Sequence, residues 1–218
     1  MISAPKNPVP VFPLPGVMLF PYAILQLHVF ELRYRTMVRD ALSGERLIVM
    51  ALLKPGWERD YYGSPEFFPV GCLARFEEVE WLVNDCYDLK LTGTVRVRLS
   101  RIAREFPYRA ARVEPVPQAP LTEDDPLVTL EKRALGDACA RLVREAQDEW
   151  ETLPELSGDA GYEALVNRVC MALRSNPLEK QSLLELDSVL ERGRQAREMV
   201  ERRLQRPARR TPGGGEHN

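Results

Sequence analysis

The alternation of apolar and polar residues changes period twice near the start of the chain. Between residues 23 and 30 apolar positions alternate with polar ones, which is the period of a half-buried strand. From Glu31 to Leu42 apolar residues recur every three or four positions, which predicts a helix that ends near Gly44. Residues 46–53 are almost continuously apolar and predict a strand covered on both faces.

Short strand patterns fill most of the next sixty residues. Apolar–polar alternation predicts strands over residues 70–82, 87–99 and 108–114, with Gly93 breaking the middle one. Asn84-Asp85 is a plausible turn between the first two. With a first strand at residues 9–12, this pattern predicts a strongly bent sheet or barrel with the first helix plugging one side.

The pattern beyond residue 114 is helical throughout. Four prolines mark residues 115–126 as a linker, and helical periods follow at 127–150, 162–173, 180–187 and 188–204. Asn176-Pro177 with Glu179 forms a variant of the capping box. The sequence thus predicts an α+β chain: a β-barrel domain at 1–114, the linker at 115–126, a helical bundle at 127–205 and a disordered tail at 206–218.

The segment 54–69 is rich in turn residues and in large aromatics. Its prolines and glycines predict a long loop, and long loops in compact domains are commonly functional. Two interpretations stay open. Trp57, Tyr61 and Tyr62 either fold back to close the core, or the aromatics form an exposed patch, rimmed by Glu58, Arg59 and Asp60, that grips polypeptide. The candidate binding residues are Trp57, Tyr61, Tyr62, Phe67 and Phe68.

Composition adds few constraints. The net charge is −2 with both signs interleaved, which gives no electrostatic case for wholesale binding to nucleic acid or membranes. The first ten residues do not form a signal peptide and no stretch is apolar enough to span a membrane, so we expect a cytoplasmic protein. The four cysteines are scattered without a C-x-x-C pair, so we expect buried thiols, no metal site and no cofactor.

No catalytic constellation emerges from the motifs. The chain lacks a phosphate-binding loop, an H-E-x-x-H zinc motif and a G-x-S-x-G elbow. His28 lies on the polar side of its strand, which favours a structural or surface role. A cryptic hydrolase with a Ser–Lys pair remains a third hypothesis, because such a pair need not be close in sequence.

Arginines give the predicted β region a basic character. They could contact RNA phosphates, or they could simply form the wet face of alternating strands. RNA binding is therefore the alternative function, although no aromatic residues are interleaved between residues 95 and 102. The arginines concerned are Arg75, Arg96, Arg98, Arg101, Arg104, Arg109 and Arg112.

Several motifs together resemble the N-terminal, substrate-binding domain of Lon protease. The opening match comprises residues 12–16 (FPLPG), 19–21 (LFP), 27–31 (LHVFE), 33–34 (RY) and 37–38 (MV). Further matches lie at residues 69–77, 89–97, 108–114 and, in the helices, 173–192. The resemblance thus covers most of the chain.

The resemblance implies a PUA-like β-barrel with one embedded helix, followed by a helical bundle. It also implies a stand-alone, non-catalytic module that recognises protein substrates, because 218 residues are too few to add the ATPase and Ser–Lys protease of full-length Lon. The expected partners are unfolded or extended polypeptide and, for an adaptor in proteolysis or protein quality control, a protease or chaperone. The resemblance carries over no catalytic residue.

Overall fold

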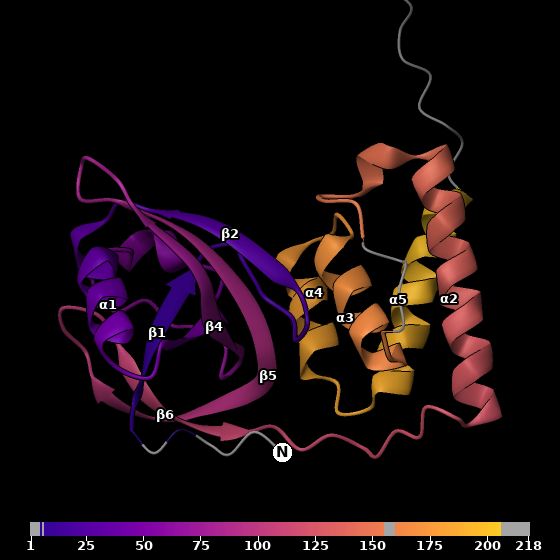
Figure 1. Cartoon of the computed structure of the whole chain (residues 1–218), viewed down its shortest axis with the longest axis horizontal. Coiled ribbons are helices and arrows are strands. Elements are labelled where there is room, and N and C mark those ends of the chain that lie inside the picture. Colours follow the sequence, from indigo (N-terminus) through magenta and orange to yellow (C-terminus); the bar gives the residue numbers. More distant parts are fainter. Residues whose placement is uncertain (1–4, 6, 155–159, 206–218) are drawn as a thin grey trace, which may run out of the picture.

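A ring of strands and a group of helices lie side by side in the computed structural model, which describes residues 5, 7–154 and 160–205 (Figure 1). The strands are β1 (Val9–Leu14), β2 (Ile24–Val29), β3 (Leu47–Leu52), β4 (Val70–Trp81), β5 (Tyr87–Arg104) and β6 (Ala110–Pro115). The α-helices are α1 (Leu32–Ser43), α2 (Pro126–Glu145), α3 (Tyr162–Ala172), α4 (Pro177–Glu185) and α5 (Val189–Leu204). The chain is therefore mixed α+β, as the sequence predicts.

Five of the six strands close on themselves. The sheet order is β2-β5-β4-β3-β1-β6, and β5 pairs again with β6. The strand β5 pairs with β2 over Tyr87–Thr92 and with β6 over Val97–Arg104, so one long strand joins both parts. This ring occupies the part of the chain for which the sequence predicts a barrel, with α1 at the end farthest from the other helices (Figure 1).

The predicted strand break at Gly93 is wrong. The strand β5 runs unbroken for 18 residues, and its pairing with β4 shifts register between Ala74–Gly93 and Leu73–Val95. A Cβ atom at position 93 would overlap the carbonyl oxygen of Phe20. The glycine therefore marks a bulge and a close approach of two backbones. Both are common reasons for a glycine inside a strand that does not end there.

The strand β3 is buried on both faces, which confirms its sequence prediction. Ile48, Met50 and Leu52 belong to the larger hydrophobic core, which also includes Met37 and Val38 of α1. Val49 and Ala51 belong to a smaller core, which is made of residues from the five strands of the ring. A nearly continuous apolar run is needed because each face contacts a different core.

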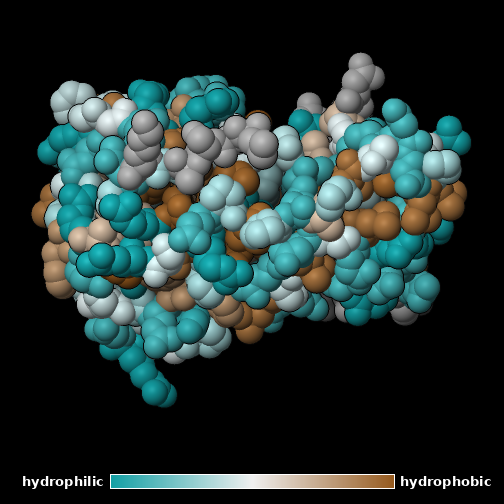
Figure 2. Space-filling view, turned by 90° about the horizontal axis from the view of Figure 1, so that it is seen from below, coloured by the Kyte–Doolittle hydropathy of each residue, from teal (hydrophilic) through white to brown (hydrophobic). Residues whose placement is uncertain are grey.

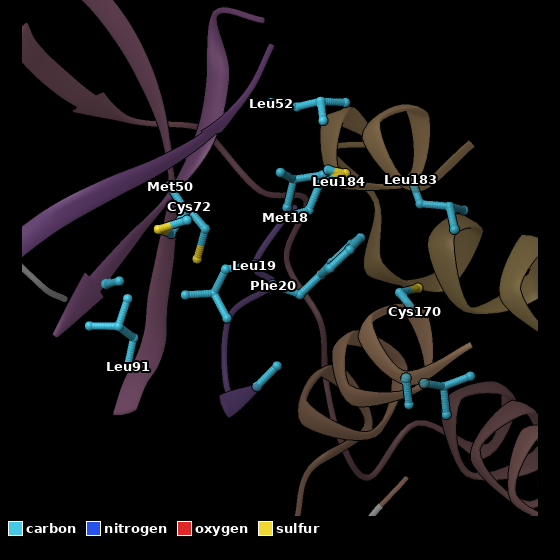
Figure 3. Close-up of a cluster of buried hydrophobic side chains, with 14 of the residues drawn as sticks. Met18, Leu19, Phe20, Met50, Leu52, Cys72, Leu91, Cys170, Leu183 and Leu184 are labelled. Carbon is cyan, nitrogen blue, oxygen red and sulfur yellow. The ribbon is translucent and has the colours of Figure 1, made fainter. Parts of the chain in front are cut away.

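The larger core continues from the ring into the helices. The segment between β1 and β2 places Met18, Leu19 and Phe20 between the two groups of elements (Figure 3). Met18 and Phe20 point toward the helices, where Leu183 and Leu184 of α4 belong to the same core, whereas Leu19 points toward Cys72 and Leu91 of the strands (Figure 3). The ring and the helices thus share one hydrophobic cluster.

Arg96 of β5 lies at the junction between the ring and the helices and is only 2% exposed. Its guanidinium donates hydrogen bonds to the carbonyls of Leu184 (3.0 Å), Leu186 (2.7 Å) and Pro117 (3.2 Å). The prediction that this arginine shares a wet sheet face is therefore wrong. Alternation identifies the two sides of a strand, but it does not show that a helix covers one of them.

Arg192 of α5 reaches the same end of α4 and is fully buried. It donates to the carbonyls of Leu183 (2.9 Å) and Leu186 (2.5 Å) and to the side-chain oxygen of Asn167 (3.0 Å). The last carbonyls of a helix lack intrahelical partners, and arginine can satisfy several at once. Burial, and then the charge of Arg192, lowers the pKa of Arg96 to about 10, so it keeps its charge at neutral pH.

The helices begin largely where their caps predict. Asn176 and Glu179 form the complete capping box of α4, and Ser188 accepts from the Glu191 N–H at the start of α5. The helix α2 ends at Glu145, earlier than predicted, and a 3₁₀ turn η2 (Gln147–Glu149) follows. Glu131 of α2 forms ion pairs with Arg194 (3.0 Å) and Arg197 (3.4 Å) of α5.

The four cysteines differ in burial, and the surface is mostly hydrophilic. Cys72, Cys139 and Cys170 are buried, whereas Cys86 is half-buried beside the β4–β5 turn. Hydrophilic residues cover most of the face in Figure 2, with apolar residues in smaller groups between them. Within residues 5, 7–154 and 160–205, no helix is both long and apolar enough to cross a membrane. The predicted tail, residues 206–218, lies outside the described residues.

Candidate functional site

The segment 54–69, which we call the aromatic loop, is closed at its base by main-chain hydrogen bonds. The Lys54 N–H donates to the Glu66 carbonyl (2.8 Å), and the Phe68 N–H donates to the Leu52 carbonyl (2.9 Å). Between them lies a 3₁₀ turn, η1 (Trp57–Asp60), which begins after Gly56. Gly56 has a φ of 91°, a conformation that glycine adopts without steric cost. The loop therefore has a defined shape.

Two of the five candidate residues, Phe67 and Phe68, pack inward. Phe67 packs on the smaller core and Phe68 on the larger one, and both are half-buried. The guanidinium of Arg109 lies 4.6 Å from the centre of the Phe67 ring and donates to the Pro65 carbonyl (2.6 Å). These two phenylalanines therefore pack against the two cores and are not part of an exposed patch.

The other three candidates, Trp57, Tyr61 and Tyr62, form a cluster at the surface. The rings of Trp57 and Tyr61 meet edge to face at 5.4 Å, and those of Tyr61 and Tyr62 at 5.2 Å. Tyr62 is 86% exposed, whereas the other two are half-buried. Tyr62 thus does not fold back over the core, and Trp57 and Tyr61 are only partly covered.

Tyr61 is anchored to the start of α1. Its hydroxyl donates to Glu31 Oε1 (2.5 Å), and its carbonyl accepts from Arg33 Nη1 (3.1 Å). The Arg33 guanidinium also lies 4.9 Å from the centre of the Tyr61 ring, a cation–π distance. Burial raises the pKa of Tyr61, and the hydrogen bond to Glu31 raises it further, so the phenol stays protonated at neutral pH. The cluster is held in place without burying Tyr62.

Sequence reasoning missed Phe106, which extends this cluster. Phe106 is 72% exposed and lines the same hollow, of about 60 Å³, as Tyr62, Arg33 and Arg109. It follows β5 in an exposed segment, so no periodic pattern identifies it. We call Trp57, Tyr61, Tyr62 and Phe106 the loop surface.

Two further exposed apolar residues, Phe30 and Leu32, flank Glu31. They are 64% and 69% exposed. Phe30 had a signal in the sequence, because it falls on the polar side of β2 together with Gln26 and His28. An aromatic residue at a polar position is typical of an interaction surface.

His28 lies on the exposed side of β2, next to Asp88 of β5. Its Nδ1 atom is 2.7 Å from Asp88 Oδ1, and both side chains are about half exposed. Its imidazole ring stacks at 6.1 Å on the ring of Phe30. The surface role expected from its strand position agrees with this exposure. Within the described part of the chain, no cluster of three or more His, Cys, Asp or Glu residues could hold a metal ion.

The arginines considered for RNA binding are dispersed in their contacts. Arg96 is buried, Arg109 lies over Phe67, and Arg104 lies 3.8 Å from the centre of the Tyr108 ring. Arg75 pairs with Glu77 at 2.8 Å. Arg98, Arg101 and Arg112 are exposed, and the last two face each other across β5 and β6. The aromatic cluster therefore offers a more coherent site than the arginines do.

The comparison with known families identifies the chain. The family model of the ATP-dependent protease La (LON) substrate-binding domain matches residues 8–202. The chain belongs to the Lon substrate-binding domain family. This confirms the resemblance drawn from the opening motifs, and the match extends into α5.

Curated relatives of this Lon-family chain are much longer proteins. The Lon protease of Anaeromyxobacter dehalogenans is 28% identical over 151 residues, which cover 69% of this chain and 17% of the relative. Lon protease 2 of Sorangium cellulosum is 30% identical over 152 residues, which cover 70% of this chain and 18% of the relative. The chain therefore spans less than a fifth of the length of these relatives.

Solved structures of Lon N-terminal domains share the fold. The N-terminal domain of the Mycobacterium avium complex Lon protease has a TM-score of 0.66 at 20% identity, covering 89% of this chain and 98% of that one. The Lon N-terminal domain protein from Xanthomonas campestris has a TM-score of 0.62 at 24% identity, covering 87% of this chain and 96% of that one. At these identities the likeness concerns the fold alone.

Proposed function

We propose that this chain is a non-catalytic module that binds unfolded or extended polypeptide through the loop surface. The observation that carries the proposal is the anchored aromatic cluster, with Tyr62 and Phe106 left exposed, in a chain of a substrate-binding family. Aromatic rings provide a large apolar contact area at low conformational-entropy cost. Apolar side chains that a folded protein would bury are the ligands that suit such a surface.

Charged residues around the loop surface support the same function. Glu58, Arg59 and Asp60 are exposed on η1, next to Trp57 and Tyr61. A polar rim around an apolar centre is typical of protein–protein contacts, and charges of both signs favour no single ligand charge. We therefore expect recognition of exposed apolar residues in varied sequence contexts.

Finer statements belong to the same proposal. We assign the closed ring to the PUA-like barrels and α2–α5 to a helical bundle, joined by residues 115–126; the second β5–β6 pairing and the Glu131 ion pairs support this assignment. We also propose an adaptor role, delivering polypeptide to a protease or chaperone, and the membership in the Lon substrate-binding domain family supports it. The cytoplasmic location stays a prediction.

Fluorescence anisotropy tests the proposal with a fluorescein-labelled, reduced and alkylated α-lactalbumin as the unfolded polypeptide. We expect saturable binding by the wild-type protein, and Tyr62→Ala with Phe106→Ala to weaken it about tenfold, since two hot-spot aromatics are lost. The matched control is Leu130→Ala, because Leu130 is 63% exposed on α2. Equal loss in the control, or no loss in the double variant, would remove the loop surface from the account.

A further inference from the structure

The strand β2 has a neighbour on one side only. It pairs with β5 from Ile24–Thr92 to Val29–Tyr87, and it stands at the end of the sheet order. The opposite end strand, β6, pairs with both β1 and β5. Among the described strands, β2 is thus the one that pairs with a single other strand, and its free edge lies along the upper border of the ring in Figure 1.

The hydrogen bonds at the start of β2 show which residues face that edge. The Gly93 N–H donates to the Ala23 carbonyl (3.0 Å), so residue 23 bonds toward β5. In an antiparallel pair the bonding direction alternates from residue to residue. The main-chain groups of Leu25 and Leu27 therefore point toward β5, and those of Gln26 and His28 point away from it.

The sequence of β2 does not protect this edge. Natural edge strands are commonly blocked by lysine, proline or a bulge, and ILQLHV contains none of these. Leu25 and Leu27 face the core yet stay half-buried, which is consistent with an uncovered edge. By contrast β6 carries Arg112 and ends at Pro115 although its edges are paired.

Apolar surface lies at both ends of the open edge. At its start, Tyr22 and Ile24 line a groove of about 190 Å³ with Leu153 and with Met171 of α3. Tyr22, Ile24 and Leu153 are 46%, 54% and 61% exposed. At its other end, Val29 leads to the exposed Phe30 and then to Glu31, which accepts the hydrogen bond from Tyr61. The edge therefore connects an apolar groove to the loop surface.

We propose that an extended polypeptide adds to β2 as an extra strand, with its main chain bonded to Gln26 and His28. This inference rests on the proposed function and specifies how the ligand is held. Strand addition explains how varied sequences can bind, because main-chain hydrogen bonds give affinity and pockets select alternate side chains. One such side chain enters the groove beside Ile24, and the polypeptide then continues past Phe30 to the loop surface. The paired segment is about six residues, roughly 20 Å, long.

The test compares two versions of one probe on the wild-type protein. The probe is a fluorescein-labelled peptide of nine residues with leucine at alternate positions and serine or lysine between them. Its twin carries N-methyl groups on the alternate amides that would face β2. We expect the twin to bind at least about tenfold more weakly, because each lost main-chain hydrogen bond costs on the order of 1 kcal/mol.

A proline variant tests the same edge from the side of the protein. Gln26→Pro removes an outward-facing N–H, a position where edge strands tolerate proline, and Gln26→Ala is the matched control. We expect Gln26→Pro, with an unchanged unfolding midpoint, to weaken peptide binding about tenfold and Gln26→Ala to leave it unchanged. If the proline variant does not fold, the N-methylated peptide on the wild-type protein decides the question.

The outcomes separate this inference from the proposed function. Equal binding of both peptides overturns strand addition, while Tyr62-dependent binding of unfolded α-lactalbumin would keep the proposed function. Absence of binding to either peptide and to α-lactalbumin overturns both. Sedimentation of the protein alone tests whether a second copy of the chain occupies the edge of β2 instead. If the wild type were a dimer that Gln26→Pro converts to a monomer, the edge would belong to that second copy and the proposal would be overturned.

Discussion

The junction between the ring and the helices and the loop surface reverse the usual placing of side chains. At the junction the charged Arg96 and Arg192 are buried, whereas at the loop surface the aromatic Tyr62 and Phe106 are exposed. The buried charges are satisfied by helix-end carbonyls, so they contribute to the fold. The exposed aromatics leave most of their surface open to solvent, so they are available to a ligand.

The difference leads to opposite expectations for the two regions. A change at the junction should lower the free energy of unfolding and affect binding only through the fold. A change at the exposed part of the loop surface should weaken binding and leave unfolding almost unaltered. Variants that break this rule would show that one of the regions has been assigned the wrong role.

The largest effect is expected for Arg192→Leu. The change removes the buried guanidinium that donates to the carbonyls of Leu183 and Leu186 at the end of α4 and to the side-chain oxygen of Asn167. It should lower the free energy of unfolding by roughly 3–5 kcal/mol. Urea unfolding measures this. The control is Arg202→Leu on the exposed side of α5, for which we expect a change within about 0.5 kcal/mol. Similar values for both would contradict the role of Arg192 at the junction.

The next effect concerns two glycines changed to alanine. Gly93→Ala should lower the free energy of unfolding by about 1–3 kcal/mol, because its methyl group would overlap the Phe20 carbonyl between the ring and the helices. Gly136→Ala in α2 meets no atom within 4 Å and should raise the free energy by up to about 1 kcal/mol. Thermal unfolding of the pair shows whether the signs differ. Two stabilised variants would argue against the close approach at position 93.

A smaller effect, with a pH signature, is expected for Tyr162→Phe. The buried Tyr162 hydroxyl has no hydrogen-bond partner within the described structure, so its removal at pH 7 should be neutral or slightly stabilising. Burial, and then the charge of Glu131, raises the pKa of Tyr162 to about 12. Above pH 10 the unfolded chain loses this proton while the folded chain keeps it, so stability falls as the pH rises toward 12.

The variant should show a weaker alkaline loss than the wild type. We expect a difference on the order of 1 kcal/mol at pH 11, in favour of Tyr162→Phe, measured by urea unfolding at pH 7 and pH 11. Tyr34→Phe is the comparison, because burial also raises the pKa of Tyr34 to about 12 but its hydroxyl donates to the Pro13 carbonyl. That variant should therefore lose stability at pH 7. If the free energy of unfolding fell equally between pH 7 and pH 11 in Tyr162→Phe and the wild type, the raised pKa of Tyr162 would be refuted.

Local signals in the sequence predicted most of the elements. The helix α1, the doubly buried β3 and the capping box of α4 depend on residues at most a few positions apart, so their patterns survive in the structure. Gly93 and Arg96 could not be assigned in this way. Their roles depend on the Phe20 carbonyl and on α4, which is about ninety residues from Arg96 along the chain. Alternation gives the sides of a strand but not what covers them.

The candidate site was predicted in composition but not in detail. The aromatics identified the segment 54–69, but the sequence did not show that Phe67 and Phe68 pack inward whereas Trp57, Tyr61 and Tyr62 cluster at the surface. The positions of these aromatic side chains depend on contacts with residues outside the segment. Arg109 contacts Phe67, and Glu31 and Arg33 bind Tyr61. Phe106 had no signal, since it follows a strand end without any periodic pattern.

The smallest effect compares the two neighbouring tyrosines of the loop surface. Tyr61→Phe removes a hydroxyl that donates to Glu31 and should lower the free energy of unfolding by roughly 0.5–1 kcal/mol, because this part-buried site competes with water for the bond. Tyr62→Phe removes a hydroxyl from a side chain that is 86% exposed and should change it by less than about 0.5 kcal/mol. Both variants keep the aromatic ring, so binding of unfolded α-lactalbumin should be preserved in Tyr62→Phe and weakened in Tyr62→Ala. If Tyr62→Phe also lost binding, the hydroxyl rather than the apolar ring would contact the ligand, and the loop surface would act by polar recognition.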